Sequence, residues 1–516
     1  MNDSNLDIPA LTRSAAAVTV GSLVATQAHI RPDAIAIVEG TREISYGTFN
    51  ARVNRLAHVL ATRGIGRGER LALLSENRAE YLEIECAAAK LGAIVACQNW
   101  RLADPELLHC LRLTTPGLLI VSPRYAEVAA RIDHGIDDVL VLGPAYEALL
   151  DGAPDQEPEA AAEVQPEDGL TILYTSGTTG LPKGAVISHR AAIARAQLMA
   201  MDMAVEASDT FVAWAPFFHM VSTDPGLGAL MRGSKIIVLD GFDPVALADI
   251  VGREELGWLV LMPGMIEPLI DELKRRNVKP RGIKTCGAMA DLVPRHQIAE
   301  ITELLDAPFV NSFGSTETGV PPATASLLAV GQVPENLAKR QNSLTLLRLV
   351  DADDNDVPDS APGEAALRTP CLFSGYWNNP EANAEDFRGG WFHMGDMFVR
   401  NPDGSLDFVD RAKYLIKSGG ENIYPAEIER VLLADGRVDD AVVVRRADDK
   451  WGEVPVAFVA RNDEGLAADA LLAACRRELA GYKQPKEIRF VALDDLPRST
   501  TGKIQRHEIE RWLEEG

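Results

Sequence analysis

The stretch that most constrains the fold of this chain is residues 174–184, Tyr-Thr-Ser-Gly-Thr-Thr-Gly-Leu-Pro-Lys-Gly. Apolar runs at 169–173 and 185–189 flank it, so the pattern predicts a strand, a short polar loop and a second strand. Glycines let backbone N–H groups approach a ligand, hydroxyls add donors, and Lys183 adds a positive charge. The loop therefore predicts a polyphosphate site; a polar hairpin without a ligand is the plainer alternative. It is not a Walker A loop, because Gly184 follows the lysine.

Length and charge narrow the class of protein. The 516 residues allow two or more domains, and 47% hydrophobic residues are typical of a globular protein. A net charge of −24 argues against a nucleic-acid partner. No run of eighteen apolar residues predicts a membrane span, and the acidic N-terminus does not resemble a signal peptide. Six scattered cysteines without a CxxC pair predict reduced thiols in a cytoplasmic protein and make a zinc site improbable.

Alternating strand and helix patterns fill residues 15–145. Strands are predicted at 34–38, 70–74 and 92–97, and helices at 48–62 and 79–91, which is the rhythm of a doubly wound α/β region. Residues 146–168 are rich in Ala, Pro, Glu and Asp and predict a mobile surface connector.

Four later segments carry residue types suited to a nucleotide and a reactive acid. They are Asn311-Ser-Phe-Gly-Ser-Thr-Glu317, Gly390-Trp-Phe-His-Met-Gly-Asp396, Asp410-Arg-Ala-Lys-Tyr-Leu-Ile-Lys-Ser-Gly-Gly-Glu421 and Pro497-Arg-Ser-Thr-Thr-Gly-Lys503. An aromatic face suits a purine, and a carboxylate suits both a hard cation and a ribose diol. With the loop at 174–184, they resemble in order the signatures of the adenylate-forming (AMP-binding) superfamily, in its acyl-CoA synthetase/ligase branch.

The resemblance implies a set of ATP and CoA contacts. Lys503, Thr175, Glu317 and His219 would be catalytic, and Glu317 would hold Mg²⁺. The residues expected at the nucleotide and CoA are Thr175, Ser176, Gly177, Thr178, Thr179, Gly180, Lys183, Gly287, Ala288, Met289, Asn311, Ser312, Phe313, Gly314, Thr316, Asp396, Arg411, Lys413, Lys417, Gly419, Gly420 and Glu421. Residues 319–350 depart from the family pattern and receive no role.

The acyl pocket is expected at the end of a buried strand that breaks at Pro216. The resemblance places His219, Val221, Asp224, Met289 and Phe313 there. Two interpretations of Asp224 are open: it caps a helix that starts near Pro225, or it hydrogen-bonds a polar substituent of the substrate. Aromatic, alicyclic and medium-chain acids are all compatible with the sequence.

The resemblance also implies the architecture and the activity. A large N-terminal adenylation domain (1–410), built from doubly wound α/β subdomains and a β-barrel-like part, would join through a hinge (411–414) to a small mobile α+β domain (415–516). The chain would activate a carboxylic acid with ATP and Mg²⁺ and pass the acyl group to CoA. A carrier-loading enzyme acting in trans and a non-catalytic nucleotide-binding regulator are the alternatives. A homodimer is one possible assembly.

Overall fold

The computed structural model describes residues 7–175, 181–411, 414–418, 421–448, 450–498 and 504–515. The chain divides into two compact units. The larger unit comprises Met1–Leu346 and Arg368–Phe387, and the smaller unit comprises Leu347–Leu367 and Arg388–Gly516. The predicted hinge at 411–414 lies inside the smaller unit and stays a prediction, since two of its residues are outside the described chain.

The first sheet of the larger unit has the strand order β6-β5-β3-β4-β7-β8. Its strands are β3 (Arg70–Leu74), β4 (Ile94–Cys97), β5 (Leu118–Val121), β6 (Val139–Val141), β7 (Gly169–Thr175) and β8 (Lys183–Ser188). All neighbouring pairs are parallel except β7 and β8. The strands are almost wholly apolar because a parallel sheet is covered on both faces, and the predicted alternation of strand and helix is confirmed.

Two further sheets of the larger unit mix parallel and antiparallel pairs, in the orders β2-β1-β10-β9 and β11-β12-β13-β16. Their strands are β1 (Ile35–Glu39), β2 (Arg42–Ser45), β9 (Phe211–Ala213), β10 (Ile236–Val238), β11 (Glu255–Leu259), β12 (Gly282–Cys286), β13 (Phe309–Val310) and β16 (Leu327–Leu328). A short ribbon pairs β14 (Gly314–Ser315) with β15 (Gly319–Pro322).

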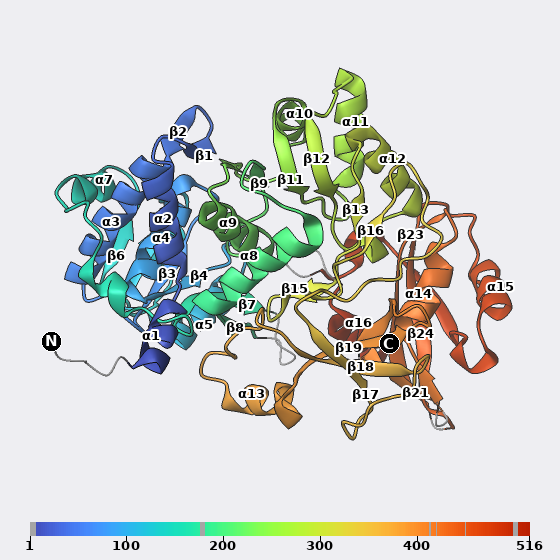
Figure 1. Cartoon of the computed structure of the whole chain (residues 1–516). Helices are drawn as coiled ribbons and strands as arrows, with labels where there is room; N and C mark the ends of the chain where they lie inside the picture. Colours follow the sequence, from blue (N-terminus) through green and yellow to red (C-terminus); the bar gives the residue numbers. More distant parts are fainter. Residues whose placement is uncertain are drawn as a thin grey trace. The chain divides into compact units, whose positions relative to one another are not determined.

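Helices cover these sheets (Figure 1). They are α1 (Ile8–Ala15), α2 (Val20–Ile30), α3 (Tyr46–Thr62), α4 (Ala79–Leu91), α5 (Asp104–Thr114), α6 (Ala126–Arg131), α7 (Pro144–Asp151), α8 (His189–Met203), α9 (Met220–Arg232), α10 (Pro244–Arg253), α11 (Ile266–Arg276), α12 (Arg295–Leu305) and α13 (Pro380–Asp386). Every residue of α4 is buried, because α2, α3 and its own sheet enclose it. Helices α8 and α9 pack against each other, so that the buried Arg195 of α8 meets the buried Asp224 of α9.

The smaller unit contains two sheets. One has the order β17-β18-β19-β20, with β17 (Leu346–Val350), β18 (Pro362–Arg368), β19 (Phe392–Arg400) and β20 (Leu406–Arg411). The other has the order β22-β21-β24-β23 with β25 beside β24: β21 (Ile416–Ser418), β22 (Glu421–Ile423), β23 (Val438–Asp448), β24 (Gly452–Arg461) and β25 (Glu487–Val491). Helices α14 (Pro425–Leu433), α15 (Ala468–Glu478) and α16 (Arg506–Glu515) accompany it.

The surface connector predicted at 146–168 is mostly exposed, but it contains a helix and makes buried contacts that were not predicted. Helix α7 occupies its start, and Tyr146 is buried with its hydroxyl donating to Glu83 Oε2 at 3.1 Å. Glu157 accepts from the buried Lys90 Nζ at 2.6 Å, and Asn50 and Asn54 also accept from that ammonium. Composition indicated a polar surface segment, but it did not reveal a buried lysine that needs a carboxylate from this segment.

Two predictions about the whole chain can be compared with the structure. No helix among the described residues is long and apolar enough to cross a membrane. All six cysteines lie in the described part of the chain, and each is buried and unbridged.

The contact between Lys90 and the connector can be tested by mutation. Glu157→Ala leaves Lys90 without its carboxylate partner, so we expect the free energy of unfolding to fall by about 1–3 kcal/mol. Glu159→Ala, at an exposed position of the same segment, should change it by less than about 0.5 kcal/mol. Chemical denaturation of both variants measures the difference, and equal stabilities would contradict docking of this segment.

Candidate active site

The predicted phosphate loop joins two antiparallel strands of the first sheet. Thr175 at the end of β7 pairs in register with Lys183 at the start of β8, so the two predicted residues stand on either side of the loop. Ser176, Gly177, Thr178, Thr179 and Gly180 lie outside the described residues, and their phosphate contacts stay predictions. The hairpin nevertheless sets Lys183 at the mouth of the loop, as a phosphate-binding cation requires.

A cluster of polar groups lies around Lys183. Its Nζ is 4.7 Å from the centroid of the Tyr376 ring, and the Tyr376 hydroxyl donates to Glu317 Oε1 at 2.9 Å. Burial and the neighbouring Glu317 raise the pKa of Tyr376 well above its ordinary value, so the phenol keeps its proton and donates. The Asp386 carboxyl lies near the same hydroxyl; burial raises the pKa of Asp386, and the charge of Lys183 opposes that rise. Lys183 and Glu317, which are far apart in sequence, are thus brought together.

The donor set around Glu317 fits magnesium that is bound together with a nucleotide. No group of three or more His, Cys, Asp or Glu side chains in the described chain could hold a metal ion by itself. Magnesium is usually held by one or two carboxylates and by substrate phosphates rather than by an all-protein cage. Glu317 is only half-buried, and Lys183, at the end of the predicted phosphate loop, lies over the ring of the tyrosine that bonds Glu317, so this single carboxylate fits that requirement.

The two segments predicted to hold adenine, 287–289 and 311–316, also contact each other. The Met289 N–H donates to Ser312 Oγ at 2.9 Å, and Trp258 Nε1 donates to the Gly287 carbonyl at 2.8 Å. Gly287 has φ +83°, and a Cβ there would stand 2.3 Å from the Phe309 ring, so only glycine fits. Gly287, Ala288 and Met289 therefore form a close-packed backbone wall beside the segment 311–317.

Lys339 is a site residue that the sequence did not reveal. It is fully buried, and its Nζ donates to Asn311 Oδ1 at 2.6 Å and to Asp291 Oδ2 at 2.5 Å. The same ammonium lies 5.9 Å from the centroid of the Phe313 ring. The atypical region 319–350 thus holds the predicted adenine segment in place. A lysine in a loop without apolar periodicity gave no signal of this role.

The predicted acyl pocket begins at helix α9. His219 is its N-cap, and its Nδ1 accepts from the Val221 N–H at 3.3 Å. The interpretation of Asp224 as the cap of a helix near Pro225 is wrong, because α9 starts at Met220 and continues through both residues. Asp224 is buried, and its Oδ2 accepts from Arg195 Nη1 at 2.9 Å.

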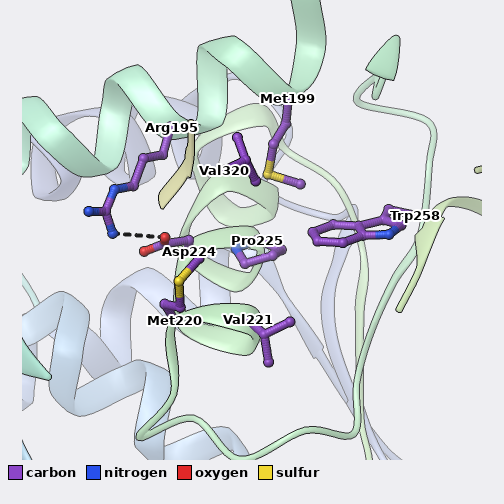
Figure 2. Close-up of a pocket in the computed structure, with 8 residues that line it drawn as sticks. All are labelled: Arg195, Met199, Met220, Val221, Asp224, Pro225, Trp258 and Val320. Atoms are coloured by element: carbon purple, nitrogen blue, oxygen red, sulfur yellow. Dashed lines mark hydrogen bonds and ion pairs between the residues drawn. The ribbon is translucent and has the colours of Figure 1, made fainter. Parts of the chain in front are cut away.

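A cavity lies beside this ion pair (Figure 2). Its lining consists of Arg195, Met199, Met220, Val221, Asp224, Pro225, Trp258 and Val320. Val221 and Asp224 are shared with the predicted pocket, whereas His219, Met289 and Phe313 are not among these eight residues. Arg195, from α8, was not anticipated. An arginine on a helix is usually solvated, so only its spatial neighbours identify it.

The smaller unit contains Asp396, the residue predicted to bind the ribose of the nucleotide. Asp396 is buried on β19, and Arg411 Nε donates to its Oδ1 at 3.0 Å from the paired position on β20. Lys417 is exposed on β21, and its N–H donates to Glu453 Oε2 at 2.8 Å. Glu421 starts β22. Lys413, Gly419, Gly420 and Lys503 lie outside the described residues, and their roles stay predictions.

Asp410, next to the predicted hinge, is a buried carboxylate. Its oxygens accept from the Arg411 N–H at 2.6 Å and from the Ala426 N–H at 2.8 Å. Burial raises the pKa of Asp410 to about 6, although Arg506 lowers it. This carboxylate therefore connects the end of β20 to the start of α14.

Comparison with known proteins places this geometry in a family. The chain matches the AMP-binding enzyme family over residues 24–377 and the AMP-binding enzyme C-terminal domain over residues 427–503. An indoleacetate–CoA ligase from Aromatoleum aromaticum is 35% identical over 94% of this chain and 96% of the relative. A feruloyl-CoA synthase from Amycolatopsis sp. is 34% identical over 95% of this chain and 98% of the relative. The structure of o-succinylbenzoate CoA synthetase from Bacillus subtilis with its acyl-adenylate intermediate matches with a TM-score of 0.82, 26% identity and coverage of 95% and 97%.

These findings define an AMP-forming acid–thiol ligase that acts through an acyl-adenylate and uses ATP, Mg²⁺ and CoA. The chain belongs to the AMP-binding enzyme family. The predicted family, fold class, enzyme class and cofactors are confirmed, and the main prediction is favoured over the carrier-loading and regulatory alternatives.

The buried Asp410 predicts a pH dependence of stability. In the folded state its carboxyl loses its proton near pH 6, against about 3.8 when unfolded, so the folded state binds more protons between these values. Burying the Asp410 charge lowers the free energy of unfolding. This cost is absent at a pH below the pKa of the unfolded state and complete at a pH above the pKa of the folded state. Asp410→Asn has no such cost, so its stability relative to the parent should rise by up to about 3 kcal/mol from pH 4 to pH 6.

Denaturant unfolding at several pH values measures this difference. Asp407→Asn, at an exposed position of the same strand, is the matched control and should show a nearly constant difference. A difference for Asp410→Asn that does not vary with pH would contradict the assignment.

Proposed function

We propose that the residues assembled around Lys183 and Glu317 carry out the first half-reaction, in which a carboxylic acid attacks the α-phosphorus of ATP and pyrophosphate leaves. The observation that carries this proposal is the contact of Lys183 and Glu317 with the same tyrosine beside the phosphate loop. Phosphoryl-type transfer depends mainly on positioning and on neutralising charge. A cation, a carboxylate for Mg²⁺ and a hydroxyl-rich loop supply both.

The predicted residues that contact ATP or the acid take the following roles in this step. Thr175, Ser176, Thr178, Thr179 and Lys183 hold the phosphates, and Glu317 holds Mg²⁺, which supplies charge neutralisation when bound. Phe313 stacks on adenine against the wall at 287–289, Asp396 accepts hydrogen bonds from the ribose, and Lys503 bridges the carboxylate and the α-phosphate. Tyr376 fixes the orientation of the Glu317 carboxylate through its hydroxyl.

The second half-reaction transfers the acyl group to the thiol of CoA. We assign it to an alternate position of the small domain, reached by rotation about Lys413, in which Lys503 leaves and the Gly419–Gly420 segment enters. Such alternation gives each step its own surroundings and excludes water from the reactive acyl-adenylate. Asp410 borders this hinge and joins β20 to α14.

The acyl substrate is proposed to be an aromatic acid. The indoleacetate and ferulate ligases cover almost the whole chain at 35% and 34% identity. The small cavity at Arg195 is bordered by Trp258, Met199, Met220 and Pro225, which give it a mainly apolar wall. A screen of aromatic, alicyclic and medium-chain acids by pyrophosphate release, with and without CoA, tests this class.

Three finer properties complete the proposal. A cytoplasmic location is supported by six buried, unbridged cysteines, as expected where thiols stay reduced. A homodimer remains a proposal for solution measurements such as sedimentation. Transfer to free CoA, rather than to a carrier protein, is tested by assaying thioester formation with CoA alone.

The role of Lys503 separates the two half-reactions. Lys503→Ala should lower carboxylate-dependent ATP–pyrophosphate exchange by at least about 100-fold, because a charge-assisted contact to the reacting groups is lost. Thioester formation from supplied acyl-adenylate should change by less than about threefold. Lys486→Ala, at an exposed position of the same unit, is the control and should leave both rates unchanged. Equal loss of both activities would refute this assignment.

The role of Tyr376 is visible in the dependence on magnesium. Tyr376→Phe removes one hydrogen bond to the Glu317 carboxylate, so the Mg²⁺ concentration for half-maximal pyrophosphate exchange should rise by about tenfold. Tyr482→Phe, at an exposed tyrosine, should leave it unchanged. An unchanged requirement in Tyr376→Phe would show that the tyrosine does not position the metal ligand.

A further inference from the structure

Strand β19 is irregular just where it carries the carboxylate predicted to bind the ribose. Strands β18 and β19 of the smaller unit are antiparallel neighbours, and Glu364 pairs with Met397 (Figure 1). The next paired positions of this ladder are Ala366 and His393. The segment 394–396 therefore has more residues than the strand opposite, and it bulges out of the ladder. Bulges are frequent beside active sites, where they redirect a side chain.

Glu364 holds the middle of this bulge. Its Oε1 accepts from the Gly395 N–H at 3.1 Å. Gly395 has φ +75°, a left-handed conformation that glycine adopts without steric cost. The Glu364 side chain is only 15% exposed, so the contact is largely shielded from water. One carboxylate thus fixes the peptide group of Gly395, which directly precedes Asp396.

The other oxygen of Glu364 is held by two basic side chains. Arg388 Nη2 donates to Oε2 at 2.5 Å, and His393 Nδ1 lies 3.4 Å from the same oxygen. The His393 side chain is fully buried, and its Nε2 lies 3.7 Å from Asp354 Oδ1. A charge-assisted bond on one oxygen and an enclosed ring beside it leave the Glu364 carboxylate in one orientation, with Oε1 directed at the bulge.

Asp396 itself is oriented from the opposite strand. It pairs with Arg411 on β20, and Arg411 Nε donates to its Oδ1 at 3.0 Å. Asp396 is 2% exposed, so its side chain has little freedom to adjust. Its side chain is therefore held by Arg411, and the backbone before it is held by Glu364. Hydrogen bonds from a ribose depend on distance and angle, so a displaced bulge would weaken them.

We propose that Glu364 is a positioning residue for nucleotide recognition, and that it lets the enzyme distinguish ribose from deoxyribose by fixing the bulge that presents Asp396. The inference rests on the proposed function, in which Asp396 accepts hydrogen bonds from the ribose. Glu364 has no contact with the nucleotide in this assignment and acts through the Gly395 peptide. The reach of its side chain to that N–H, rather than its charge toward Arg388, is the property that matters.

Nucleotide affinity, measured without acid or CoA, tests the proposal. Isothermal titration calorimetry of the full chain with Mg²⁺ compares ATP with 2′,3′-dideoxy-ATP, which lacks both ribose hydroxyls. We expect the dideoxy nucleotide to bind at least about 30-fold more weakly, because two hydrogen bonds to a charged group are lost. Asp396→Ala should bring this affinity ratio toward one, and it gives the value expected when ribose recognition is absent.

Two conservative variants of Glu364 separate the reach of the side chain from its charge. Glu364→Asp keeps the charge but is a methylene shorter, so it falls short of the Gly395 N–H and the affinity ratio should fall at least about fivefold. Glu364→Gln keeps the length and an acceptor oxygen, so it should retain the ratio within about twofold. A role limited to the ion pair with Arg388 predicts the opposite order. Glu464→Asp, at an exposed position of the same unit, is the matched control and should keep the ratio of the parent.

The outcomes are separable. If the unmodified enzyme binds both nucleotides equally well, or Asp396→Ala keeps their ratio, the proposed ribose contact fails and this inference falls with it. If the parent discriminates but Glu364→Asp does so equally well, or Glu364→Gln loses the ratio, the ribose contact stands and the inference is overturned.

Thermal unfolding of each variant verifies that it folds. Glu364→Ala, which also lacks the acceptor for the Gly395 N–H, replaces Glu364→Asp if the latter does not fold, and the same loss is expected. If neither variant folds, the inference is overturned, because the carboxylate then serves the fold alone.

Discussion

A single buried guanidinium connects the parts of the larger unit that meet at the site. Arg195 extends from α8 and bonds the carbonyls of Thr316 and Glu317, the carbonyl of Cys371, and the carboxylate of Asp224 on α9. Its side chain is almost fully removed from water, so each of these contacts replaces hydration that the charge has lost. The backbone that presents Glu317 is consequently fixed by the same group that lines the cavity beside α9. Even Gly319 is constrained, since a Cβ there would stand 2.8 Å from Arg195 Nε.

The distribution of cations explains how a chain with a net charge of −24 can attract a polyphosphate. Lys339 is buried against Asp291 and Asn311, and Arg195 is buried against Asp224, so both serve the architecture. Lys183 differs from them, because it is half-buried beside the loop and lies over the face of an aromatic ring. Local charge at the loop, rather than the net charge of the protein, is therefore what a nucleotide bound at the predicted site would meet.

The sequence predicted what depends on local pattern. Helix α4 was predicted at its observed bounds, and the strands on both sides of the phosphate loop followed from continuous apolar runs. Lys183, Glu317 and Asp396 were predicted as site residues because glycine-rich or aromatic motifs surround them, and their roles stay predictions. Arg195, Lys339 and Tyr376 were missed as site residues, because their roles arise from partners more than 25 residues away in sequence. The docking of Glu157 on Lys90 was missed for the same reason, and composition alone then favoured a mobile connector.

The error about Asp224 shows how one sequence pattern can occur either at a helix start or inside a helix. Aspartate followed by proline is a frequent helix start, since proline tolerates the first turn and aspartate caps it. Here His219 caps the helix earlier, and Pro225 lies inside α9. The same proline that suggested a helix start instead lies inside the helix, where it removes a backbone donor beside a cavity that Asp224 and Pro225 both line. Asp224 consequently pairs with Arg195 of the neighbouring helix α8 instead of capping its own helix, so a buried ion pair joins α8 to α9.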